Sequence, residues 1–301
     1  MTRHQLSKTT GLHHVTAFAT DPTRNARFYT EVFGLSLVKR TVNFDDPYTW
    51  HLYFGDAGGR PGTLLTHFPN PRMARGTHGT PEIVETVLCC GRATLDALVD
   101  RAEQAGVAVH VHGGVDGDRW SLEDPDGMRL SVGVEAGAEA ATGLRLAGTV
   151  VRPSADGAFA GFLTGVLGFV ASTKAASRFE VAGAEDGDWV EIDSSAAGDR
   201  SKMGAGTVHH VAWRVDDEAA QLAVADALRE AGLAVTPVLD RQYFQSIYCR
   251  VPGGVIFEFA TDGPGFAVDE PAGELGRALK LPAQYETRRA EIEARLPRFD
   301  D

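Results

Sequence analysis

The stretch Thr207–Trp213 reads TVHHVAW, a β-branched and aromatic run that is typical of a strand. A second apolar strand, Val255–Ala260 (VIFEFA), contains a single carboxylate, Glu258. A charge in such a strand is costly to bury unless it is paired or bound to a metal. Far upstream, Gly11–Phe18 (GLHHVTAF) repeats the His-His-Val signature. Two such strands and one buried glutamate predict the two-histidine, one-carboxylate ligand set of open Fe(II) sites.

The composition limits the class of protein. The 301 residues suffice for two ordinary domains or one large one, and the formal net charge of −12 argues against nucleic acid or anionic membrane as partners. Cys89, Cys90 and Cys249 form no C-x-x-C pair, and adjacent cysteines rarely meet disulfide geometry. That usage fits a reducing cytosol. No apolar run approaches the roughly 18 residues of a spanning helix. We expect a cytoplasmic globular protein.

Four segments of the chain share one plan, which the ends of the predicted helices expose. Asp21 reads as the N-cap of the first helix, Pro22 takes its first position, and Gly34 ends it. An extended pattern resumes after that glycine. The other three helices are predicted to end at Gly106, Gly168 and Gly232.

Each predicted helix is preceded by one strand and followed by several short ones. In the second segment the later strands are Ala108–His112, Arg119–Glu123 and Met128–Val132. The repeated unit is therefore βαβββ, which is too small and one-sided to bury its own sheet. Pairs of units are expected to curl into two half-open β-barrels with helices outside. The predicted fold class is α+β.

This plan resembles the vicinal oxygen chelate superfamily, which groups glyoxalases, bleomycin resistance proteins and extradiol dioxygenases. Gly11–Thr16 (GLHHVT), Tyr29–Leu35 and Asp240–Tyr248 (DRQYFQSIY) are similar to the hydroquinone-type ring-cleaving dioxygenases. The resemblance covers nearly the whole chain, including the tail. The sequence departs from the usual motif of this family at Cys249, where an aromatic residue is expected, and at Val251–Gly254, where an Asp-Pro turn is common. These departures bear on pocket size and substrate.

Alignment of the units shows which of them can hold a metal. When the helix-ending glycines are aligned, the place of His14 and His210 falls on Thr86 in the second unit and on Gly148 in the third. Neither of these residues is a ligand. In the final strands, the place of Glu258 falls on Thr66, Ser131 and Glu191.

Only the first and fourth units can therefore assemble a site, from His14, His210 and Glu258. Because metal–ligand bonds are about 2 Å long, both histidines must lie in one barrel. The first unit should then pair with the fourth, and the second with the third. Glu191 has no histidine in its unit, so we expect a structural role for it. Thr66 leaves the metal more open than the carboxylate found there in glyoxalase-type enzymes.

The predicted domains follow from this pairing. Residues 11–68 and 206–262 are expected to form the metal-binding barrel, and residues 82–194 the second barrel. Residues 263–301 are expected to be a C-terminal extension. Its helix is predicted from Pro282 to Leu296, with one charged side that packs on a barrel or on a partner subunit. If the helix packs on a partner subunit, the protein is a homo-oligomer.

The choice of histidine within each pair is not fixed by the strand pattern alone. Neighbours in a strand face opposite sides, so His14 shares a face with Thr16 and His13 shares the other with Val15. Alternation does not explain how His13 and His209 could reach a substrate. The resemblance implies that His14 and His210 are the ligands.

The resemblance also implies the roles of five further residues near the metal, and Phe244, which lies just before the last strand, is added to them. Their side chains would contact substrate or dioxygen, and an arginine can stabilise phenolate charge while a tyrosine hydroxyl exchanges a proton. Tyr248, Arg241 and His209 are the predicted catalytic residues. His13, Thr16 and Phe244 are the predicted substrate-binding residues.

Three functions are compatible with the predicted fold and metal site. The first is a non-haem Fe(II) extradiol-type dioxygenase that opens a hydroquinone or related dihydroxylated aromatic with dioxygen. The second is a metal-dependent glyoxalase-like isomerase or thiol transferase, against which Thr66 argues. The third is a non-catalytic protein of the same fold that binds an aromatic or antibiotic-like ligand, against which the complete ligand set argues. Mn(II) or Zn(II) could replace iron, because imidazole and carboxylate suit several metals.

Overall fold

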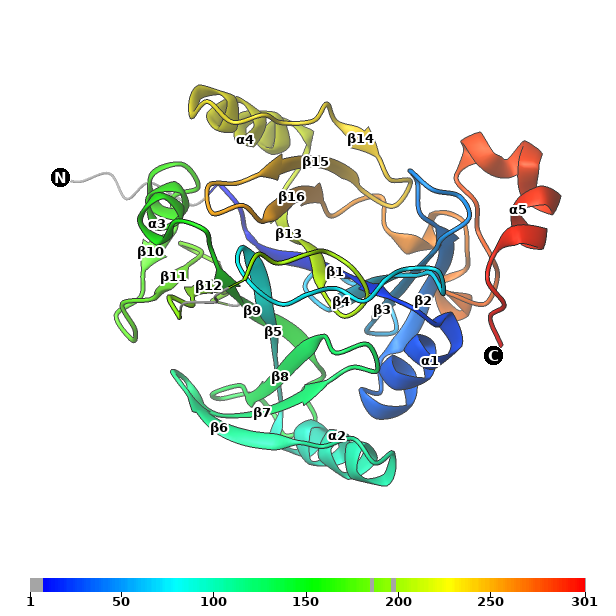
Figure 1. The fold of residues 1–301 in the computed structure, drawn as a ribbon, viewed down its shortest axis with the longest axis horizontal. Coiled ribbons are helices and arrows are strands. Elements are labelled where there is room, and N and C mark those ends of the chain that lie inside the picture. The colour runs from blue at the N-terminus through cyan, green and yellow to red at the C-terminus, as the bar shows by residue number, and fades with distance from the viewer. Residues whose placement is uncertain (1–7, 185–186, 196–198, 301) are drawn as a thin grey trace.

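The computed structural model describes residues 8–184, 187–195 and 199–300 as two eight-stranded mixed sheets with helices on their outer faces (Figure 1). The first sheet has the order β14-β15-β16-β13-β1-β4-β3-β2. Its strands are β1 Gly11–Ala19, β2 Ser36–Val42, β3 Trp50–Gly55, β4 Leu64–Pro69, β13 Val208–Val215, β14 Leu239–Asp240, β15 Gln245–Arg250 and β16 Ile256–Thr261.

The second sheet repeats this arrangement with the order β10-β11-β12-β9-β5-β8-β7-β6. Its strands are β5 Glu82–Cys90, β6 His110–Gly114, β7 Gly117–Glu123, β8 Arg129–Val134, β9 Arg145–Arg152, β10 Val170–Ala171, β11 Arg178–Glu180 and β12 Trp189–Ile192.

The order of strands confirms the α+β class and the crossed pairing of units. Strands from the first and fourth units form one sheet, and strands from the second and third form the other. In each sheet the two units meet through one antiparallel pair, β1 with β13 and β5 with β9. The division of the chain into domains at residues 11–68 with 206–262, 82–194 and 263–301 stays a prediction.

Four helices follow the first strands of the units, as the sequence predicts. They are α1 Pro22–Arg27, continued by a π-helical turn Phe28–Val32, α2 Arg92–Gln104, α3 Asp156–Gly165 and α4 Glu218–Glu230. Asp21 caps α1 by accepting a hydrogen bond from the backbone nitrogen of Arg24 at 2.9 Å. Gly34, Gly106, Gly168 and Gly232 have φ between +71° and +79°, a left-handed conformation that ends a helix at low steric cost.

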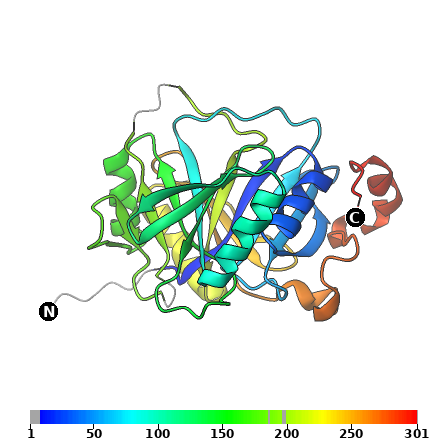
Figure 2. The ribbon, with the colours of Figure 1, turned by 90° about the horizontal axis from the view of Figure 1, so that it is seen from below.

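In Figure 2, α1 and α2 lie side by side, and the Arg101 side chain of α2 donates to the carbonyl of Val32 at 2.9 Å. Among the described residues no helix is long and apolar enough to cross a membrane.

The tail after β16 packs along the first sheet rather than standing apart from it. The predicted helix from Pro282 to Leu296 is divided into a 3₁₀ segment, Ala283–Arg288, and the helix α5, Arg289–Arg295. The division falls at Arg288, whose backbone (φ −109°, ψ 12°) is not helical. Ile292 is fully buried in a small core with Val42 of β2. The tail therefore extends the hydrophobic core of the first sheet.

A buried lysine ties this tail to the sheet. Lys39 of β2 is fully buried, and its ammonium lies 2.6 Å from Asp269 and in contact with Glu270. It also donates to the carbonyl of Phe266 at 3.2 Å. Several charged hydrogen bonds of this kind are what a buried cation requires.

We predict that Lys39→Met destabilises the protein by about 3–5 kcal/mol, because it leaves two carboxylates without their cation in a mostly buried position. Urea unfolding of wild type and variant measures the difference. Arg229→Met is the matched control, since the pair of Arg229 with Asp226 is solvent-exposed and surface pairs contribute about 0–1 kcal/mol. Equal losses in the two variants would contradict the role of Lys39.

Candidate metal centre

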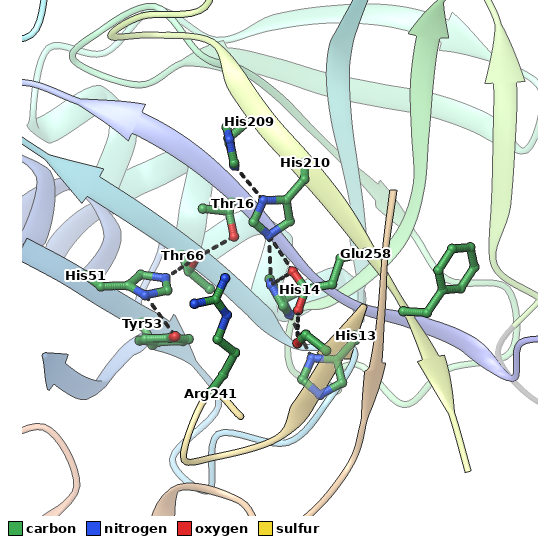
Figure 3. A network of polar contacts seen from close by, with 12 residues as sticks. His13, His14, Thr16, His51, Tyr53, Thr66, His209, His210, Arg241 and Glu258 are labelled. Carbon is green, nitrogen blue, oxygen red and sulfur yellow. Dashed lines mark hydrogen bonds and ion pairs between the residues drawn. The ribbon is translucent and has the colours of Figure 1, made fainter. Parts of the chain in front are cut away.

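Three strands of the first sheet bring His14, His210 and Glu258 to one point (Figure 3). One donor atom from each residue lies within 4.8 Å of the others. The Nε2 atoms of the two histidines are 3.2 Å apart, and they lie 3.3 Å and 2.8 Å from Oε2 of Glu258. Among the described residues this is the only group of three such side chains.

Strand register explains the convergence. β13 is parallel to β16, and Ala212 is paired with Glu258, so the carboxylate lies beside the histidine pair of β13. Phe257 and Phe259 flank Glu258 and are fully buried among the helices on the outer face. Alternation along β16 therefore turns Glu258 to the inner face. The antiparallel pairing of β1 with β13 then brings His14 opposite Ala212.

A β-bulge accompanies each histidine pair. The β1–β13 register shifts between Leu12 and His14, which leaves His13 as an extra residue on β1. A second shift between Thr16 and Ala17 leaves His209 as the extra residue on β13. A bulge interrupts the alternation of faces, so neighbouring side chains can meet. The sequence pattern could not supply this distortion.

The bulges let each ligand candidate be held by the histidine before it. Nδ1 of His13 lies 2.9 Å from Nδ1 of His14, and Nδ1 of His209 lies 2.7 Å from Nδ1 of His210. A metal-ligating imidazole generally has a partner for its other ring nitrogen, which fixes its orientation. The His-His sequence thus supplies a ligand candidate and its support in consecutive residues.

The charges of the group fit a cation. Burial lowers the pKa of His210. Burial alone would raise the pKa of Glu258, but His14 and His210 hold that pKa well below its usual range, so the carboxylate is ionised. Oε2 of Glu258 is buried without a well-formed hydrogen bond. When the Nδ1 atoms are engaged, the Nε2 lone pairs and this oxygen converge on one point. Such a donor set suits a divalent metal.

A cavity of about 470 Å³ opens over the inner face of the group. Of the residues predicted from sequence, Arg241, Tyr248, Phe244 and His209 line this cavity together with His14 and His210. Glu258 is fully buried beneath them. The aromatic side chains Phe18, Phe44, Phe68 and Phe244 also border the space.

His13 and Thr16 lie elsewhere. His13 is 1 % exposed and packs against Phe244, with ring centroids 4.9 Å apart, so it stands behind the cavity wall. Thr16 is fully buried, and its hydroxyl lies 2.8 Å from that of Thr66. Neither residue is among those that line the cavity, and their substrate-binding roles stay predictions.

Arg241 and Tyr248 form one polar corner of the cavity. The guanidinium lies over the Tyr248 ring, 5.3 Å from its centroid, and 3.3 Å from Asp45. Burial and the nearby Glu258 raise the pKa of Tyr248, so its hydroxyl stays protonated at neutral pH. Burial opposes the charge of Arg241, yet Tyr248 and Asp45 raise its pKa above the ordinary value. The corner offers a fixed cation and a proton donor.

His51 and Tyr53 also line the cavity, and sequence reasoning missed them. Nε2 of His51 lies 3.0 Å from the Thr66 hydroxyl, and its Nδ1 lies 2.9 Å from the Tyr53 hydroxyl. Burial lowers the pKa of His51 and keeps the ring neutral. The alternation in Trp50–Gly55 places both residues on one face, but only tertiary structure places that face beside His14.

Within the part of the chain that the structure describes, the second sheet contains no comparable group. Its bulges leave Val84 and Ala147 as the extra residues, so Glu85 takes the place of His14. Counting from the glycines pointed instead to Thr86, one residue away, because 21 residues separate Glu85 from Gly106, whereas 20 separate His14 from Gly34. Gly148 takes the place of His210, and the ring of Trp189 occupies the space where a side chain would be.

The carboxylate at the equivalent of Glu258 serves an ion-pair network. Glu191 lies 3.0 Å from Arg178, which is almost fully buried and stacks over Trp189 at 3.9 Å. His110 and His112 border a separate cavity of about 690 Å³, and both are exposed. No group of three ligand candidates includes them among the described residues.

The paired βαβββ units and the two-histidine, one-carboxylate group define a protein of the vicinal oxygen chelate type. A family model described as the Glyoxalase/Bleomycin resistance protein/Dioxygenase superfamily matches residues 11–132 and 149–259. The chain belongs to this superfamily.

Within this superfamily, the chain is similar to several proteins named as dioxygenases. The chain is 39% identical over 311 residues to "Putative ring-cleaving dioxygenase MhqO" of Bacillus subtilis (strain 168), covering 97% of each chain. It is 28% identical to a chlorohydroquinone/hydroquinone 1,2-dioxygenase of Sphingobium indicum, covering 94% of each. The crystal structure of a "putative dioxygenase" from Bacillus subtilis subsp. subtilis str. 168 superposes with a TM-score of 0.90 at 34% identity and 98% coverage of both chains.

We predict that Glu258→Gln sharply reduces the content of divalent metal, because the amide removes the one anionic ligand candidate. Glu191→Gln is the matched control, since that carboxylate occupies the equivalent strand position in the other sheet. Elemental analysis after loading with Fe(II) under anaerobic conditions measures both. Metal retained by the first variant, or lost equally by both, would remove this assignment.

Proposed function

We propose that the protein is a non-haem Fe(II)-dependent dioxygenase that cleaves the ring of a hydroquinone or a related dihydroxylated aromatic. The observation that carries the proposal is the convergence of His14, His210 and Glu258 beneath an aromatic-lined cavity. The chemistry that Fe(II) supplies when bound is the transfer of electron density from a phenolate to dioxygen. The names of the relatives support this reaction class.

The openness of the site favours oxygen chemistry over isomerisation. Thr66 is paired with Thr16 in the β1–β4 ladder, at the position that Glu258 holds in the fourth unit. Its hydroxyl is engaged by Thr16 and His51. Three protein ligands would leave up to three octahedral positions for exogenous groups. A carboxylate at residue 66 would close one of them.

The side chains around the cavity support a phenolic substrate. Phe18, Phe44, Phe68 and Phe244 provide flat apolar walls on which an aromatic ring can pack. Arg241 provides a positive charge that stabilises a phenolate. Tyr248 holds a proton that it can donate to an oxygen of the opening ring, and take back from an incoming hydroxyl.

The direct test is oxygen uptake by protein loaded with Fe(II) under anaerobic conditions and mixed with a panel of substituted hydroquinones and catechols. Consumption of oxygen with a ring-opened product, seen by mass spectrometry, supports the proposal. Glu258→Gln protein serves as the control for metal-free oxidation. Absence of uptake by iron-replete protein with every member of the panel would overturn it.

We predict that Tyr248→Phe lowers turnover at least tenfold, within the roughly 10²- to 10⁴-fold that general acid–base groups contribute. The variant keeps the ring that lies over Arg241 and His210 and loses only the hydroxyl. Iron content and the unfolding midpoint should match wild type. Near-normal oxygen uptake by an iron-replete variant would show that Tyr248 only packs.

We predict that Arg241→Lys is also poorly tolerated, because an ammonium presents its donors from one point and a guanidinium presents a planar fork. The side chain is held between the rings of Phe44 and Tyr248, an arrangement that suits a flat cation. We expect a higher KM for the aromatic substrate with unchanged metal content. A variant with wild-type KM would show that only the charge matters.

A further inference from the structure

The side chains of the turn Asp240–Phe244 point in two directions. Arg241 and Phe244 line the cavity, whereas Gln242 and Tyr243 point to the tail that follows β16. The backbone nitrogen of Arg241 donates to the carbonyl of Phe244 at 3.0 Å, which closes the turn on itself. Any displacement of the tail-facing residues would therefore also move the two cavity-lining residues.

One carboxylate of the tail holds both tail-facing residues. Oδ2 of Asp269 accepts from the Gln242 amide at 2.7 Å and from the Tyr243 hydroxyl at 3.0 Å. Its other oxygen lies 2.6 Å from the buried ammonium of Lys39. The ammonium also lies 4.9 Å from the centre of the Tyr243 ring. Asp269 thus links the turn to a fixed cation in β2.

The rest of the tail supports this link. The backbone nitrogen of Gly265 donates to the carbonyl of Tyr243 at 2.8 Å, and the Phe266 ring packs on Tyr243 at 5.0 Å between centroids. Glu270 shares Lys39 with Asp269, but its other contacts are the backbone nitrogens of Gly276 and Ala278 within the tail. Only Asp269 of the two carboxylates touches the turn.

The backbone of the turn is strained at the residue that Asp269 holds. Gln242 has φ of +68°, and it is the one non-glycine residue with positive φ in the part of the chain that the structure describes. A long side chain in this region costs free energy and persists where its surroundings fix it. The Asp269 contact supplies such a fixation.

We propose that Asp269 is a positioning residue for substrate, which acts by holding the turn so that Arg241 and Phe244 face the cavity. The proposal rests on the proposed function for its kinetic consequence, and on geometry alone for the coupling between tail and turn. The C-terminal extension is then part of the substrate-binding apparatus, in addition to covering the sheet.

Asp269→Asn tests this with Glu270→Gln as the matched control. Misplacement of a substrate contact by about 1 Å can cost about 10²-fold in rate, so we expect Asp269→Asn to lower kcat/KM for the aromatic substrate about tenfold. Iron content should not change. Glu270→Gln perturbs the same lysine but leaves the hydrogen bonds between Asp269 and the turn in place, so its loss of kcat/KM should be much smaller. Equal losses of kcat/KM in both variants would overturn the proposal.

A double-mutant cycle separates positioning from general stability. Because Asp269 acts partly through Arg241, the loss of affinity caused by Asp269→Asn should be smaller in an Arg241→Ala background. Affinity is measured by calorimetry with hydroquinone and Zn(II)-loaded protein under anaerobic conditions, so turnover is not needed. An undiminished effect in that background would overturn the proposal.

Hydrogen exchange tests the coupling without any ligand. We expect faster exchange of the Arg241 and Gly265 amides in Asp269→Asn than in wild type or Glu270→Gln, and unchanged exchange would contradict the proposal. If wild type takes up no oxygen while this difference is seen, the proposed function fails and the coupling stands. Gln242→Gly combined with Tyr243→Phe serves where Asp269→Asn does not fold, because the pair removes both hydrogen bonds from the turn to Asp269 and glycine accommodates φ of +68°. Unchanged kcat/KM in that variant would likewise overturn the proposal.

Discussion

The antiparallel pairing of β1 with β13 is the constraint on which the rest of the site depends. It joins two segments about two thirds of the chain apart and sets their Nε2 atoms 3.2 Å from each other. Glu258 then needs only the neighbouring parallel strand to reach the same point. Three donors at such distances suit a single cation between them, which makes this group the candidate metal centre.

The bulges at His13 and His209 are the second consequence of that pairing. The two bulges lie at nearly symmetric places on the two strands. Each brings the bulged histidine, His13 or His209, close to Nδ1 of the ligand candidate that follows it. Second contacts of this kind orient metal ligands and raise their basicity. In the second sheet the same bulges occur at Val84 and Ala147, without histidines. The bulge therefore belongs to the architecture, and the first sheet has adapted it to hold imidazoles.

The two sheets show how one architecture can be open or filled. In the first, Thr66 and His51 leave a cavity of about 470 Å³ over the donors. In the second, Trp189 covers Gly148, and the guanidinium of Arg178 stacks on the indole while it pairs with Glu191. The carboxylate at the equivalent strand position thus serves an internal ion pair. Glu258 and Glu191 occupy equivalent strand positions, but Glu258 faces two histidines whereas Glu191 faces the guanidinium of Arg178.

The repeat, the pairing of units, and the two histidine pairs with Glu258 could be predicted from the sequence, whereas the choice of His14 and His210 within those pairs came from the family resemblance. Glycines at helix ends are local signals, and the presence or absence of histidine and glutamate at matching positions requires no packing information. Tertiary structure decided what depends on distant segments. Three such features are the bulges that bring His13 beside His14, the position of His51 and Tyr53 on the cavity wall, and the hydrogen bond from Gln242 to Asp269. Each depends on segments that are separated in sequence. No local pattern encodes such contacts, because their register is fixed only when the sheet closes.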